Sequence, residues 1–238
     1  MSAVTRTFLV TGASSGIGRA MAKKLLSMGF QVLGVSRDCS QFKHAHPNFS
    51  SFTLDLSALK QLPARAAELS KAYPQLDGVV FAAGAGQFGS LEEFSFAQIE
   101  QLMNLNFTGN ALLTRALLPS LKRKQKADLI YVGSEAALKG SRKGTIYCAS
   151  KFALRGFTQA LREECAKSQV RVSLINPGMV KTPFFDQLSF EPGDDMTQYI
   201  TAEDVADAMQ YILSSNPNIV LDEINLSPLN KVIKFKTG

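Results

Sequence analysis

Short apolar runs rich in β-branched residues alternate along the chain with longer stretches in which apolar residues recur every three or four positions. The short runs predict strands at 7–11, 31–35, 50–54, 77–82, 128–133, 170–175 and 219–224. The longer stretches predict helices at about 16–28, 57–73, 95–120, 146–167 and 202–215. Nearly continuous apolar strands between helices are typical of a parallel sheet buried on both faces. Right-handed crossovers then give an α/β fold, a Rossmann-type doubly wound sheet of about seven strands in three α/β/α layers.

We expect one domain over residues 1–238, because 238 residues suit a single α/β domain and no repeat or linker divides the sequence. Hydrophobic residues make up 45% and charged residues 19%, which supplies a core and lacks the signature of disorder. The apolar run at 7–10 is too short for a signal-peptide core, and no other run approaches a membrane-spanning length. These features predict a cytoplasmic protein with no membrane partner.

The net charge of +6 favours anionic ligands. The basic residues are scattered apart from runs at 122–126 and 139–143, and no basic helix or aromatic-studded strand supports a nucleic-acid partner. We also expect no metal and no disulfide. The three cysteines, Cys39, Cys148 and Cys165, are far apart in the sequence. The two histidines, His44 and His46, lie in one polar loop.

The segment TGASSGIG at 11–18 lies between the first predicted strand and the first predicted helix. Glycine permits both a tight turn and a close backbone approach to a pyrophosphate, and the following helix presents free N–H groups to the phosphates. Many turns need glycine for no other reason, but this position in an α/β chain favours a dinucleotide site. The expected binding residues are Gly12, Ser14, Ser15, Gly16, Ile17 and Gly18.

The end of the second strand indicates which dinucleotide is bound. An acidic residue usually holds the ribose 2′-OH there, but this chain has Ser36 followed by Arg37 and Asp38. A guanidinium can hold a 2′-phosphate with two parallel hydrogen bonds. We expect Asp38 to point away, unless a bulge brings it round. The sequence therefore favours NADP(H) over NAD(H), with an ordinary surface role for Arg37 as the alternative.

Tyr147 and Lys151 lie one turn apart on a predicted helix, so their side chains share a face. A free tyrosine has a pKa of about 10, and we expect the neighbouring ammonium to lower it. Ser134 follows the strand at 128–133, at the end of the sheet where doubly wound folds bind ligands. Its hydroxyl is placed to donate to a substrate oxygen. A surface pair and a capping serine are the alternatives.

These motifs together resemble the short-chain dehydrogenase/reductase family across nearly the whole chain. The resemblance implies hydride transfer between a nicotinamide and a carbonyl or alcohol, with catalytic residues Asn106, Ser134, Tyr147 and Lys151. Asn106 then holds a water of the proton relay, and Lys151 also binds the nicotinamide ribose. The remaining coenzyme residues implied by the resemblance are Asp55, Leu56, Ala83, Gly84, Pro177, Gly178, Val180 and Thr182. Where the family usually has NNAG, this chain has Phe81-Ala82-Ala83-Gly84.

The segment 179–201 has the features of a lid over an apolar small-molecule substrate. It carries Phe184 and Phe185, which we expect to contact the substrate together with Ser134 and Tyr147, although core packing is the alternative. Lys139, Arg142 and Lys143 lie near the entrance, either to attract an anionic substrate or an acidic carrier protein, or as solvated loop charges. An NADP(H)-binding sensor without turnover is the alternative function.

Related enzymes assemble through the helices that carry Asn106 and Tyr147, so we expect a homodimer or homotetramer. The apolar residues expected to face outward from those helices are Leu112, Leu113, Phe152, Phe157 and Leu161. The tail at 227–238 suggests no role.

Overall fold

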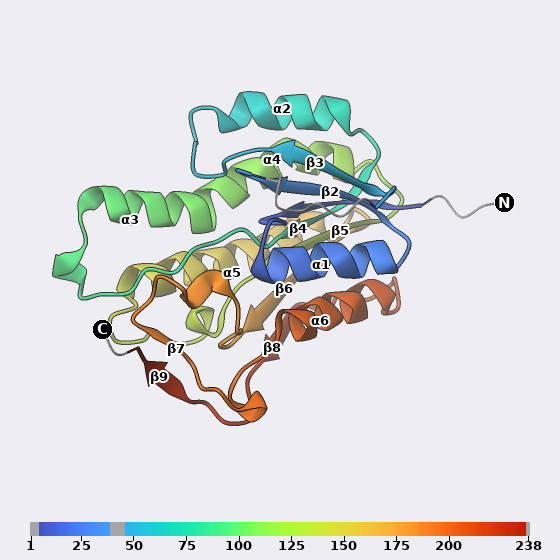
Figure 1. Cartoon of the computed structure of the whole chain (residues 1–238). Coiled ribbons are helices and arrows are strands. Elements are labelled where there is room, and N and C mark those ends of the chain that lie inside the picture. The colour runs from blue at the N-terminus through green and yellow to red at the C-terminus, as the bar shows by residue number, and fades with distance from the viewer. Residues whose placement is uncertain (1–4, 39–45, 237–238) are drawn as a thin grey trace.

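The protein is described by a computed structural model over residues 5–38 and 46–236, so Cys39 and His44 lie outside the described residues. Seven parallel strands form one sheet in the order β3-β2-β1-β4-β5-β6-β8 (Figure 1). They are β1 (Thr7–Thr11), β2 (Gln31–Ser36), β3 (Phe49–Thr53), β4 (Leu76–Phe81), β5 (Ala127–Val132), β6 (Val170–Pro177) and β8 (Glu223–Leu226). The chain adds strands on one side of β1 and then on the other, so the strand order reverses between β1 and β4. This is the predicted doubly wound sheet.

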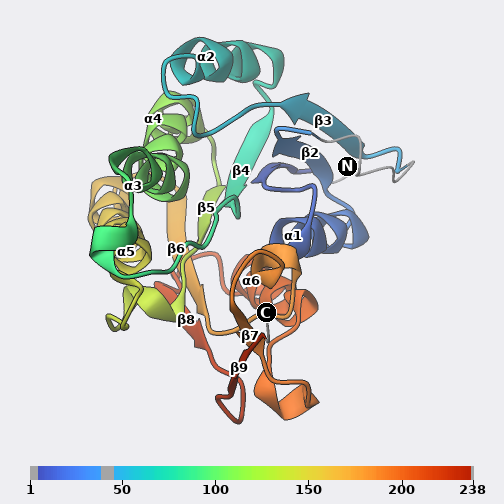
Figure 2. The same cartoon turned by 60° about the vertical axis from the view of Figure 1, so that its left-hand side comes forward.

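Helices cover both faces of the sheet, as Figure 2 shows. One face carries α1 (Gly16–Ser27) and α6 (Ala202–Ser214), and the other carries α2 (Leu62–Ala72), α4 (Gly109–Leu121) and α5 (Thr145–Cys165). Helix α3 (Phe96–Met103) projects beyond the sheet and joins α4 through a π-helical turn at Asn104–Thr108. Short 3-10 turns occur at Leu91–Glu93, Glu135–Ala137, Pro183–Phe185 and Met196–Gln198. Among the described residues, none of these helices has the length and apolar content needed to cross a bilayer.

The core forms two layers, one on each face of the sheet. All six residues of β5 and all eight of β6 are buried, which explains why their sequences are mostly apolar. In the layer beneath α4 and α5, the rings of Phe81 and Tyr131 stack with centroids 4.4 Å apart. The Tyr131 hydroxyl is satisfied by the Thr114 hydroxyl of α4, at 2.7 Å.

The predicted outward apolar face on α4 and α5 was mostly wrong. Leu113 and Leu161 are buried, and the Phe157 ring packs edge-on against Tyr131 with centroids 6.1 Å apart. Phe152 is 44% exposed. The apolar stripes of these helices face the sheet because they complete the core, so they provide little free apolar surface for assembly.

Two further short strands escaped prediction. β7 (Phe190–Pro192) and β9 (Ile233–Phe235) pair antiparallel and lie apart from the main sheet (Figure 1). They join the segment after β6 to the tail of the chain. The last strand of the main sheet was predicted at 219–224, but β8 spans Glu223–Leu226.

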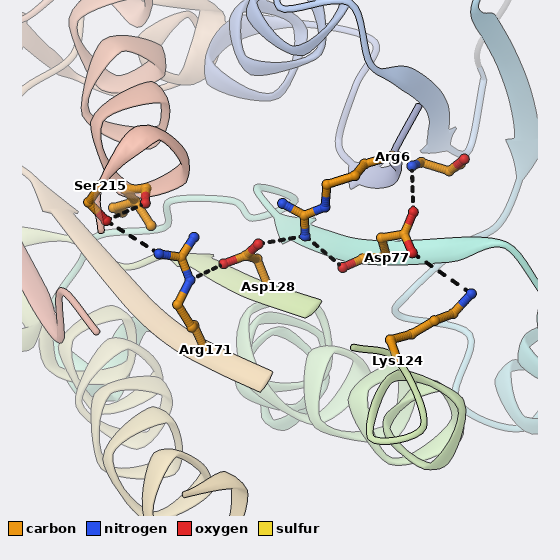
Figure 3. A network of polar contacts seen from close by, with 8 residues as sticks. Arg6, Asp77, Lys124, Asp128, Arg171 and Ser215 are labelled. Atoms are coloured by element: carbon orange, nitrogen blue, oxygen red, sulfur yellow. Dashed lines mark hydrogen bonds and ion pairs between the residues drawn. The ribbon is translucent and has the colours of Figure 1, made fainter. Parts of the chain in front are cut away.

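Charged side chains link four strands at the amino ends of the sheet. Asp128 of β5 is buried between two guanidinium groups, accepting from Arg6 at 2.6 Å and from Arg171 Nε at 2.7 Å (Figure 3). Arg6 also donates to the carbonyl of Asp77 in β4, at 3.2 Å, and Arg171 NH1 donates to the Ser215 hydroxyl beyond α6, at 3.3 Å. Both arginines converge on one carboxylate, at the end of the sheet opposite the predicted site.

Candidate active site

A cleft of about 940 Å³ opens at the carboxyl ends of the strands, where the strand order reverses. It runs from the glycine turn between β1 and α1 to Ser134 and Tyr147. Every predicted coenzyme residue lines it: Gly12, Ser14, Ser15, Gly16, Ile17, Gly18, Arg37, Asp55, Leu56, Ala83, Gly84, Tyr147, Lys151, Pro177, Gly178, Val180 and Thr182. The predicted substrate residues Phe184 and Phe185 line it as well.

The glycine turn needs glycine for steric reasons. Gly12 has φ +70°, and a Cβ there would lie 2.9 Å from the Cα of Ala83. A Cβ on Gly18 would lie 2.3 Å from the carbonyl oxygen of Gly12. Helix α1 begins at Gly16, and the side chain of its N-cap, Ser15, makes no capping hydrogen bond with the described residues. The first N–H groups of α1 therefore remain available at the cleft, a donor set that fits the pyrophosphate of a dinucleotide.

Arg19 was not predicted to lie at this end of the cleft. Its guanidinium donates to the carbonyl of Ser14, which braces the turn, and its Nε is buried without a partner among the described residues. The sequence signal was an arginine directly after the last glycine. The side chain adds positive charge beside the free N–H groups of α1.

Both Arg37 and Asp38 line the cleft, in the bend that follows β2, and both are exposed. Asp38 thus lies at the cleft together with Arg37, and the direction of its side chain stays a prediction. After β3, the Asp55 carboxylate accepts from the backbone N–H of Ser57 at 2.8 Å and from its hydroxyl at 2.6 Å. These contacts fix the turn in which Asp55 and Leu56 lie.

Ser134 and Tyr147 meet at the inner end of the cleft. Ser134 follows β5 and caps a short 3-10 turn, accepting from the N–H of Ala136 at 3.1 Å. Its hydroxyl lies close enough to Tyr147 to influence the pKa of the phenol, and both residues line the cleft. Lys151, one turn further along α5, donates to the carbonyl of Val132 at 3.1 Å and lies 5.8 Å from the Tyr147 ring centroid. The fold thus brings the three predicted side chains together.

The expected lowering of the tyrosine pKa is not found in the protein alone. Burial raises the pKa of Tyr147 to about 12, and the nearby Ser134 hydroxyl opposes that rise. Burial also lowers the pKa of Lys151 to about 8. The prediction neglected desolvation, which penalises both charged forms, and the ammonium is directed at the Val132 carbonyl. Tyr147 is therefore a protonated phenol at neutral pH, a form suited to giving a proton.

Asn106 lies behind the cleft and does not line it. Its amide accepts from the N–H of Ala85 at 2.9 Å and donates to the carbonyl of Ala85 at 3.0 Å and the Ser150 hydroxyl at 3.1 Å. Ser150 in turn donates to the carbonyl of Tyr147, at 2.7 Å. Asn106 thus ties the loop after β4 to the helix that carries Tyr147, and its water-holding role stays a prediction.

The departure from NNAG has a local consequence at Phe81-Ala82-Ala83-Gly84. The Thr11 hydroxyl of β1 accepts from the backbone N–H groups of both alanines, each at 3.1 Å. A side chain from the neighbouring strand therefore holds this loop. A Cβ on Gly84 would be in tight contact with Asn106 Oδ1, at 3.3 Å, and in ordinary contact with Lys151 Nζ, at 3.7 Å.

Aromatic rings cover the tyrosine. Phe88, from the loop after β4, lies 5.0 Å from Tyr147 between centroids, and Phe184 lies 6.1 Å from it. Phe190 of β7 contacts Phe88 at 5.0 Å and Phe185 at 5.9 Å. Sequence reasoning missed Phe88, which no motif marks. By contrast, the loop cations Lys139, Arg142 and Lys143 are exposed and lie outside the set of described residues that line the cleft.

Known proteins match this chain over most of its length. A profile of the family described as short chain dehydrogenase matches residues 6–192. An uncharacterized oxidoreductase of Staphylococcus epidermidis is 28% identical over 93% of this chain and 96% of its own length. The NADP-dependent 3-hydroxy acid dehydrogenase of Schizosaccharomyces pombe is also 28% identical, over 94% of this chain and 92% of its own. A solved alcohol dehydrogenase from the archaeon Thermococcus sibiricus, complexed with 5-hydroxy-NADP, has a TM-score of 0.85 at 25% identity and covers 96% of this chain and 99% of that chain.

Proposed function

Because this chain belongs to the short chain dehydrogenase family, we propose that it interconverts a carbonyl compound and an alcohol with NADP(H), using Tyr147 as the acid and base. The chain is an oxidoreductase of this family. The single observation that carries the finer proposal is the meeting of Ser134, Tyr147 and Lys151 in one cleft, with the buried Lys151 ammonium 5.8 Å from the Tyr147 ring.

In the direction of reduction, a bound nicotinamide supplies the hydride. Tyr147 gives its phenolic proton to the substrate oxygen, and a pKa raised by burial to about 12 keeps that proton in place at neutral pH. Ser134 donates a hydrogen bond to the same oxygen as negative charge develops there. Lys151 places a positive charge within 5.8 Å of the tyrosine ring, which stabilises the phenolate after the proton has left.

Two observations support NADP(H) as the coenzyme. Arg37 lines the cleft beyond β2, where a 2′-phosphate would lie. The relatives named above include an NADP-dependent dehydrogenase and an alcohol dehydrogenase complexed with 5-hydroxy-NADP. For the whole protein we propose a small-molecule substrate, no nucleic-acid or membrane partner, a cytoplasmic location and a homodimeric or homotetrameric assembly. The segment 179–201, with Phe184 and Phe185, is proposed as the substrate lid.

The substitution Tyr147→Phe tests the acid. It removes the proton donor and keeps the ring, so turnover of a panel of carbonyl compounds with NADPH falls by roughly 10²- to 10⁴-fold. The dissociation constant for NADPH, measured by nucleotide fluorescence, stays within about threefold of the wild-type value because the phosphate and adenosine contacts are unchanged. Turnover of the variant near the wild-type rate would contradict the role of Tyr147. Tight NADPH binding by the wild type with no carbonyl reduced would favour the alternative, a sensor without turnover.

The substitution Arg37→Ala tests the coenzyme preference. A charge-assisted contact to a 2′-phosphate is worth about 1.5–3 kcal/mol, so the variant binds NADPH roughly 10- to 150-fold more weakly. Binding of NADH, which lacks that phosphate, stays the same. Calorimetric titrations of both nucleotides provide the measurement. Equal weakening for the two nucleotides, or a wild type that prefers NADH, would remove the basis for choosing NADP(H).

A further inference from the structure

The tail of the chain is anchored to segments that neighbour the site. β9 pairs with β7 in the register Phe190↔Phe235, Glu191↔Lys234 and Pro192↔Ile233. A second set of contacts anchors the tail on either side of this pairing. Lys236 donates to the Phe185 carbonyl at 2.5 Å, Asn230 N–H to the Thr197 carbonyl at 2.8 Å, Lys231 to Glu135 at 2.6 Å and Lys234 to Asp194 at 2.7 Å. The tail is therefore held against both the lid segment and the turn that follows Ser134.

The two faces of the β7–β9 pair differ in chemistry. Residues directly opposite each other in an antiparallel pair leave it on the same face, and adjacent positions alternate. The Phe190 ring points toward Phe88, which packs on Tyr147. Phe235 therefore shares the face that turns toward the catalytic tyrosine, and Ile233 lies on it two positions away. Glu191 and Lys234, 3.8 Å apart, occupy the other face.

The face turned toward the site is apolar and only partly covered. Phe235 is 73% exposed and Ile233 is 48% exposed. They continue outward from the ring cluster of Phe88 and Phe190, over about 7 Å of strand. We call Phe235 and Ile233 the tail shelf. The lysines beside it are engaged by Glu135, Asp194 and the Phe185 carbonyl, so the shelf does not present the free positive charge that would favour an acidic protein or anionic lipid.

We propose that the tail shelf binds the hydrocarbon part of an elongated, apolar carbonyl substrate whose reacting carbon lies at Tyr147. This inference rests on the proposed function and adds a substrate class to it. Continuity with the site favours a substrate as the occupant, because ring contacts lead from Tyr147 through Phe88 and Phe190 to the strand pair that carries the shelf. Phe235 and Ile233 are then specificity-determining residues, and they lie far along the chain from every catalytic motif.

Straight-chain methyl ketones of increasing length test this assignment. Their dissociation constants are measured by calorimetry with the protein saturated with NADP⁺, where no hydride is available to reduce the ketone. Burial of each added methylene tightens binding by about two- to fourfold once the chain reaches the shelf. In Phe235→Ser and Ile233→Ser the dissociation constant changes less with ketone length, and the dissociation constants of the shortest ketones stay the same. Phe96→Ser is the matched control, because Phe96 is 92% exposed at the start of α3, and it keeps the wild-type dependence.

A wild-type dissociation constant that does not change with ketone length would overturn the shelf, as would a Phe235→Ser variant that keeps the full dependence. A lower mass for Phe235→Ser than for the wild type in light scattering would also overturn it, since the shelf would then be a contact between copies. Turnover with NADPH separates the two proposals. Ketones that bind with the expected length dependence and are never reduced support the shelf and defeat the proposed function. If short ketones are reduced but longer ketones bind no more tightly, the proposed function is supported and the shelf is defeated.

Discussion

At the scale of single residues, Lys151 brings a positive charge into the protein interior. Its side chain is 6% exposed, and its ammonium has one hydrogen bond among the described residues, to the Val132 carbonyl. Burial lowers its pKa from 10.5 to about 8. A shift of that size corresponds to about 3 kcal/mol of destabilisation when the group is charged in both folded and unfolded states. The proposed chemistry explains why the chain keeps a costly charge there, since the charge stabilises a phenolate.

Lys151→Met is therefore expected to stabilise the fold at pH 7 while abolishing turnover. The unfolded state binds more protons than the folded state between pH 8 and 10.5, so wild-type stability gains from this lysine as the pH rises through that window. The variant's advantage should be largest below pH 8 and shrink toward pH 10.5. Urea unfolding at pH 7, 9 and 10 measures it, with the exposed Lys167→Met as the control. If the extra stability of Lys151→Met stayed constant or grew with pH, the charged form of Lys151 would not destabilise the folded protein.

At the scale of elements, the strands that were predicted from the sequence most accurately include those that are buried on both faces. Strands buried on both faces, such as β1, β5 and β6, were located to within two residues because their apolar runs have clear ends. β8 lies at the sheet edge and is only partly buried, so its sequence carried little signal and its position was misjudged. β7 and β9 are three residues each, and their pairing joins distant parts of the chain. No local pattern predicts a pairing of that kind.

The same limit applies to the elements of the site. The glycine turn, Ser134 and the Tyr147–Lys151 pair were predictable because each is a local motif at a predicted strand or helix end. The helix expected at 95–120 instead contains a π-helical turn at Asn104–Thr108, which places Asn106 against Ala85 and Ser150. Phe88 reaches Tyr147 through a loop with no regular structure. Such contacts, and the pKa values that burial sets, depend on tertiary packing.

At the scale of the whole molecule, the two ends of the sheet have separate tasks. The carboxyl ends of the strands carry the cleft, and the amino ends carry the charged network around Asp128 (Figure 3). The network joins β1, β4, β5 and β6, which lie on both sides of the point where the strand order reverses. We therefore expect that activity does not require the charges at the amino ends, and that stability and activity can be perturbed independently.

Asp128→Asn should separate them. Asp128 is 1% exposed and is the shared acceptor of Arg6 and Arg171, so the variant leaves two guanidinium groups without a countercharge. Removing one partner of a buried pair costs about 3–5 kcal/mol in the free energy of unfolding, measurable by urea denaturation. The exposed Arg65–Glu68 pair supplies the control, because Glu68→Gln should change stability by less than about 1 kcal/mol. If kcat/KM of the folded Asp128→Asn protein fell together with its stability, the two ends of the sheet would be coupled and their separation into a stabilising end and an active end would be wrong.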